Sequence, residues 1–155
     1  MVYAPKMPLA QRILDEVFTP AVRPALAGNM GLPGNEDLAA LREFAAGRHV
    51  CFLGDCDPPD LLVFAWLRSQ LGMIYVGLCD RMLADSGVVL DETCVIALSA
   101  AERQARHLMH RAVPDLRELV GDKCAALLDG GAKVELEAMN RSGAASLSKL
   151  ARLFG

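Results

Sequence analysis

Short apolar runs alternate with stretches of helical spacing along most of this chain. The apolar runs of strand length are residues 2–4, 25–27, 49–53, 73–78, 88–90 and 94–98. Helical patterns separate the first four of these runs, over residues 8–17, 35–46 and 61–71. This alternation is typical of βα units around a parallel sheet, and it predicts an α/β fold whose helices flank a central, mostly parallel sheet.

The C-terminal part of the chain has mainly helical patterns. Ser99 and Glu102 have the spacing of a capping box, which predicts a helix that starts there and runs to about residue 110. Further helices are predicted over residues 114–128, 133–140 and 144–154, with glycines between them. No linker interrupts the 155 residues, so a single domain over 1–155 is expected.

Composition excludes several classes of protein. The net charge is −3, and the arginines are scattered, whereas proteins that bind duplex DNA by themselves usually carry a basic face. The five cysteines form no CxxC pair, so neither a disulfide framework nor a zinc site is predicted. No apolar run approaches the ~20 residues that cross a bilayer. A cytoplasmic protein without membrane contact is therefore expected.

Two carboxylates follow the third predicted strand. Asp55 and Asp57 are two residues apart, so on an extended segment both side chains point the same way. In open α/β sheets the carboxyl ends of the strands are where ligands bind, and carboxylate oxygens suit Mg²⁺. Asp80 follows the next strand and is a candidate third ligand. A strand-end turn without a metal is the alternative interpretation, because Asp-Pro is common in turns.

Six motifs along the chain extend this pattern. They are Gln11-Arg12-Ile13-Leu14, Asn29-Met30-Gly31-Leu32-Pro33-Gly34, Asp55-Cys56-Asp57-Pro58, Val76-Gly77-Leu78, Ala97-Leu98-Ser99 and Lys133-Val134-Glu135-Leu136-Glu137-Ala138-Met139. In this order they resemble the motifs of the Toprim domain, in the version found in the A subunit of DNA topoisomerase VI and the meiotic double-strand-break transesterase. The resemblance implies a Toprim-like, Rossmann-like fold.

The resemblance also implies a site. In that family a Glu that ends the first strand and two Asp residues hold Mg²⁺, which assists transesterification of DNA. Asp55 and Asp57 fill the two Asp positions, and Lys6 matches a family Lys that could contact a phosphate. The Glu position falls on Pro5, which cannot ligate a metal. Further departures from the family pattern lie around the same site, at Met30, at Gly34 and at Pro59 or Asp60.

Three hypotheses follow from the motif and its departures. The first is a stand-alone, degenerate Toprim-domain protein that keeps residual Mg²⁺ or phosphate binding and acts in nucleic-acid metabolism through partner proteins. The second is a non-catalytic interaction or regulatory module, with a homodimer as one form. The third is a small metal-dependent phosphoryl-transfer enzyme or nuclease. The chain is not expected to cleave DNA alone, because the family's nucleophilic tyrosine lies in a separate domain for which 155 residues leave no room.

Overall fold

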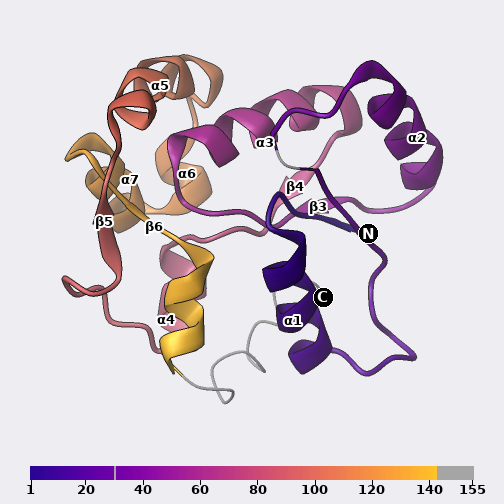
Figure 1. Ribbon diagram of the computed structural model, residues 1–155, viewed down its shortest axis with the longest axis horizontal. Coiled ribbons are helices and arrows are strands. Elements are labelled where there is room, and N and C mark those ends of the chain that lie inside the picture. The colour runs from indigo at the N-terminus through magenta and orange to yellow at the C-terminus, as the bar shows by residue number, and fades with distance from the viewer. Residues whose placement is uncertain (30, 143–155) are drawn as a thin grey trace.

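The computed structural model of the protein describes residues 1–29 and 31–142, and within them it has two β-sheets (Figure 1). The larger sheet is parallel and has the strand order β2-β1-β3-β4. Its strands are β1 (Val2–Tyr3), β2 (Leu26–Ala27), β3 (Cys51–Phe52) and β4 (Ile74–Tyr75). The smaller sheet pairs β5 (Val95–Ala97) with β6 (Ala132–Val134) in antiparallel orientation. The predicted α/β fold with a mostly parallel sheet is confirmed.

Seven α-helices and one 3₁₀ helix connect and cover these strands within the described residues. They are α1 (Met7–Val17), α2 (Asn35–Ala45), α3 (Pro58–Leu71), α4 (Asp80–Ser86), α5 (Ala100–Ala112), α6 (Leu116–Val120), α7 (Asp122–Asp129) and the 3₁₀ helix η1 (Leu136–Ser142). In Figure 1 α2 and α3 lie on one side of the parallel sheet, and α1 and α4 lie on the other. No described helix has the length and apolar character needed to cross a membrane.

Strand alternation supplies both faces of the parallel sheet with buried side chains. Tyr3 and Phe52 point toward α2 and α3, where they pack with Phe64 in one apolar cluster. Their neighbours Ala4 and Leu53 point the other way, into the cluster that contains α1. This is the period of two expected for strands that are buried on both faces. The short sheet is therefore fixed in register by two separate cores.

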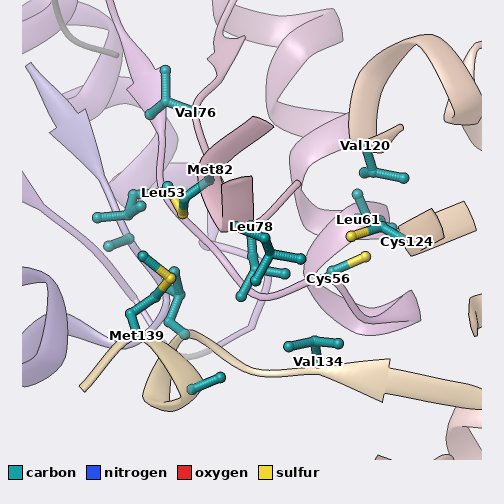
Figure 2. Close-up of a cluster of buried hydrophobic side chains, with 14 of the residues drawn as sticks. Leu53, Cys56, Leu61, Val76, Leu78, Met82, Val120, Cys124, Val134 and Met139 are labelled. Carbon is teal, nitrogen blue, oxygen red and sulfur yellow. The ribbon is translucent and has the colours of Figure 1, made fainter. Parts of the chain in front are cut away.

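Figure 2 shows part of the apolar cluster that contains α1, where this cluster packs against the ends of β3 and β4. Leu53 and Leu78 lie in it beside Met139, so the segment after β6 packs against the strand ends. Cys56 and Cys124 point toward one another, and both are buried as free thiols. The neighbouring Cys56 thiol, together with burial, raises the pKa of Cys124. They contribute to the core as small apolar groups.

Local signals explain where the main helices begin and end. The Asp57 carboxylate caps α3 by accepting the Asp60 N–H at 2.9 Å, and Gly72 ends that helix in the left-handed region at φ 64°. The predicted capping box of α5 is confirmed, with Ser99 and Glu102 each accepting the other's backbone N–H. For α2, the preference for Asn at N-caps would predict Asn35 as the cap. That prediction is wrong, because the helix starts at Asn35 and its N-cap is Gly34.

Three other predictions about secondary structure need correction. Residues 88–90 form no strand, and residues 114–128 form two helices that separate at Gly121. Gly121 has φ 88°, and the Asp80 carboxylate accepts the N–H groups of Lys123 and Cys124, which starts α7 anew. Residues 133–140 form not a helix but the end of β6 and part of η1, because pairing with β5 overrides the local helical spacing. The helix predicted over 144–154 lies outside the described residues.

Gly54 lies two residues after the end of β3, at a position where no larger residue fits. A Cβ at this position would lie 2.5 Å from Cε1 of Phe52 and 2.8 Å from Oδ2 of Asp60. We expect Gly54→Ala to lower the free energy of unfolding by roughly 1–3 kcal/mol, as overpacking does. Urea denaturation measures this, with Gly34→Ala as the control, since the nearest atom to its Cβ would be 3.6 Å away. Equal stabilities for the two variants would contradict this packing argument.

Candidate functional site

The candidate site lies where the strand order of the parallel sheet changes direction. The chain runs from β1 outward to β2 and then returns to place β3 on the other side of β1. The adjacent strands β1 and β3 therefore form the topological switch point, which is where open α/β sheets bind ligands. Lys6 follows β1 and Asp55 follows β3, so the topology brings these two residues together.

Asp55 is almost completely buried, with 1% of its surface exposed, and both its carboxylate oxygens have partners. Oδ2 lies 2.7 Å from the Lys6 ammonium. Oδ1 accepts the backbone N–H of Leu136 at 2.7 Å, which ties the strand end to η1. Burial raises the pKa of Asp55, and the contacts with Lys6 and Leu136 oppose this rise. The carboxylate thus joins three segments of the chain.

Asp57 and Asp60 form a second carboxylate pair at the start of α3. Asp57 Oδ1 accepts the Asp60 N–H, and Asp60 Oδ2 accepts the Asp55 N–H at 2.8 Å. Burial raises the pKa of Asp57 to about 6 and that of Asp60 to about 7. The negative charge of Asp55 adds to both rises, and that of Asp57 adds to the rise of Asp60, since like charges disfavour ionisation.

A second lysine lies on the other side of the site. Lys133, on β6, lies 2.8 Å from Glu102 and 2.7 Å from Glu135, and its Nζ is 3.7 Å from Asp57 Oδ2. Burial disfavours its charge, yet the hydrogen bonds to Glu102 and Glu135 raise its pKa. The pKa of Glu102 falls to about 2, because hydrogen bonds from Lys133 and Ser99 outweigh its burial.

Lys6 and Lys133 share one carboxylate, so the site is a single ionic network. Glu135 lies 3.5 Å from Lys6 Nζ through Oε2 and 2.7 Å from Lys133 Nζ through Oε1. Glu137 adds a further contact at 2.9 Å from Lys6 Nζ. A cavity of about 560 Å³ adjoins this network, lined by Pro5, Lys6, Met7, Pro8, Leu9, Gly28, Asn29 and Glu137.

The structure brings together three of the four residues that the sequence singled out. Asp55 and Asp57 lie in the network, as does Lys6, which contacts carboxylates. Asp80 does not, since its two oxygens accept the N–H groups of Lys123 and Cys124, both at 2.9 Å. Of the departures from the family pattern, Met30 falls outside the described residues.

The sequence does not assign Lys133 and the carboxylates that pair with it to the site. Lys133 and Glu135 stand in the last of the six motifs, and Glu102 is part of a predicted helix cap. Lys133 and Glu135 stand two apart, so their approach to the site depends on residues 132–134 forming a strand. Strand alternation in that segment, instead of helical spacing, is the signal that could have identified them.

The residues present do not fit a divalent cation in this arrangement. Mg²⁺ requires carboxylate oxygens that are free to face it, and it keeps a tight octahedral shell. Here the oxygens of Asp55 are taken by an ammonium and an N–H group, and one oxygen of Asp57 caps α3. Over residues 1–29 and 31–142, no three His, Cys, Asp or Glu side chains form a group that could hold a metal. The Mg²⁺ site stays a prediction that this geometry does not favour.

Comparison with known proteins adds no family to this description. The chain matches no model of a protein family and no curated protein.

The raised pKa values of Asp57 and Asp60 predict how stability depends on pH. An unfolded carboxyl group titrates near pH ~4, whereas the folded groups keep their protons up to about 6 and 7. The folded state therefore holds more protons between these values, and the free energy of unfolding should fall as the pH rises from 5 to 8. Below this range stability should decline again, because the lowered pKa of Glu102 acts in the opposite direction.

Asp60→Asn tests the origin of this slope. The amide oxygen can still accept the Asp55 N–H, but the side chain no longer titrates. We expect a flatter pH profile and a gain of about 1–2 kcal/mol at pH 8, the equivalent of roughly one pKa unit. Urea denaturation at pH 5, 6, 7 and 8 measures the change, and Glu16→Gln on the exposed part of α1 is the control. An unchanged slope in Asp60→Asn would show that this carboxyl is not its source.

Proposed function

We propose that this chain is a Toprim-like module that has lost catalysis and acts by binding other components in nucleic-acid metabolism. One observation carries the proposal. At the switch point, ammonium groups of the chain itself stand where a cation would bind, with Lys6 in contact with Asp55 and Lys133 close to Asp57. Carboxylate oxygens that are engaged in this way offer little to the hard cation that phosphodiester chemistry of this type requires.

The tyrosines support the same proposal. Tyr3 is completely buried between Phe52 and α2, and burial raises the pKa of its hydroxyl. The Tyr75 hydroxyl lies 3.1 Å from the Leu78 carbonyl oxygen and 3.3 Å from that of Asp55. Burial raises its pKa as well. Neither hydroxyl is placed to attack a phosphate, so both serve the packing of the sheet.

The number of carboxylates favours one alternative, a small metal-dependent phosphoryl-transfer enzyme. Glu135 and Glu137 stand within 3.5 Å of Lys6 Nζ, beside Asp55. In this alternative, one of these two glutamates supplies the acidic ligand that is missing at Pro5. For this alternative to hold, a metal would have to displace the Lys6 ammonium in the wild-type protein.

Metal titration separates the two functions. We expect isothermal titration with Mg²⁺ or Mn²⁺ to give no binding heat with the wild-type protein, and the protein to leave supercoiled DNA intact. The matched control is Asp55→Asn/Asp57→Asn, which should behave identically in both assays. Binding heat or DNA cleavage that the wild type shows and the double variant lacks would overturn the non-catalytic proposal and support the enzyme.

A further inference from the structure

We infer that the Lys6 ammonium takes the place of a divalent cation at this edge of the sheet and is the cation on which the local fold depends. The inference rests on the proposed function, since it explains why a chain with these carboxylates has no need of a metal. It also assigns a specific role to a residue that sequence reasoning associated with phosphate.

The surroundings of Lys6 Nζ are those of a cation site. Oxygens of three carboxylates approach it, from Asp55 at 2.7 Å, Glu137 at 2.9 Å and Glu135 at 3.5 Å. These carboxylates come from two distant parts of the sequence, the end of β3 and the segment after β6. Burial disfavours the ammonium, but the hydrogen bonds to Asp55 and Glu137 raise the pKa of Lys6, so it stays charged.

The burial of Asp55 makes some cation obligatory. Only 2% of its side chain is exposed, so water cannot compensate its charge. Removing one partner of a buried ion pair is strongly destabilising because it leaves an uncompensated charge. A metal ion could meet this need, but an ammonium on the chain itself cannot diffuse away. The contacts that join β1, β3 and η1 through Asp55 therefore form without any added ion.

Lys133 is the second cation of the network but is not equivalent to Lys6. It contacts Glu102 and Glu135 closely, while its distance to Asp57 Oδ2 is 3.7 Å. Asp57 also accepts an N–H at the start of α3, and its raised pKa lets a proton neutralise it near pH 6. Lys6 is the cation in direct contact with the most buried carboxylate, so its removal should have the larger effect.

The experiment replaces Lys6 with methionine, which keeps an unbranched side chain only one atom shorter and removes its charge. We expect the midpoint of thermal unfolding to fall by roughly 5 °C or more, and Mn²⁺ to restore part of the loss. Electron paramagnetic resonance should detect bound Mn²⁺ in this variant. The wild type should respond neither to Mn²⁺ nor to EDTA. Lys123→Met, which removes an exposed lysine outside the network, is the matched control and should behave as the wild type.

A double variant keeps the test decisive if Lys6→Met does not fold. Lys6→Met/Asp55→Asn removes both charges, so it should be more stable than Lys6→Met alone and should not respond to Mn²⁺. The inference is overturned if Lys6→Met is as stable as the wild type, if Mn²⁺ does not stabilise it, or if the double variant is no more stable. Stabilisation of the wild type itself by Mn²⁺ would instead overturn the proposed function.

Discussion

The contact between the buried Asp55 carboxylate and its two partners holds the structure together at the carboxyl edge of the parallel sheet. Lys6 brings the end of β1 to it and Leu136 brings η1, while Asp55 itself ends β3. These segments are far apart in the chain, and the charge is buried at acceptable cost only when all three are in place. The carboxylate therefore specifies the arrangement of the segments as much as it stabilises it.

This arrangement changes the meaning of the Asp-x-Asp pair. In isolation two carboxylates at a strand end suggest a metal site, because that is where open α/β sheets bind ligands. Here one carboxylate joins segments and the other caps α3, and both roles require the charges to be engaged inside the protein. Ion pairs and hydrogen bonds occupy the lone pairs that a metal would need, so the same motif can serve structure instead of catalysis.

Apolar periodicity in the sequence predicted those helices and strands whose buried face is defined by their own residues. The helices α1 and α3 and the four parallel strands lie where apolar spacing put them, because each buries a face that its own pattern defines. The prediction was wrong for residues 133–140, where helical spacing competes with pairing to β5. It was also wrong at Gly121, where the distant Asp80 carboxylate starts a new helix. Both errors arise from contacts that no short window of sequence contains.

The sequence by itself determined the α/β class, the order of the main elements and the position of Asp55 and Asp57 at a strand end, since periodicity, capping and strand alternation act over a few residues. Tertiary structure alone decided which charges meet those carboxylates. Lys6 stands 49 positions before Asp55 in the chain, and Lys133 reaches Asp57 only because residues 132–134 form a strand. Electrostatic partners depend on distance in space, and spacing along the chain does not fix that distance.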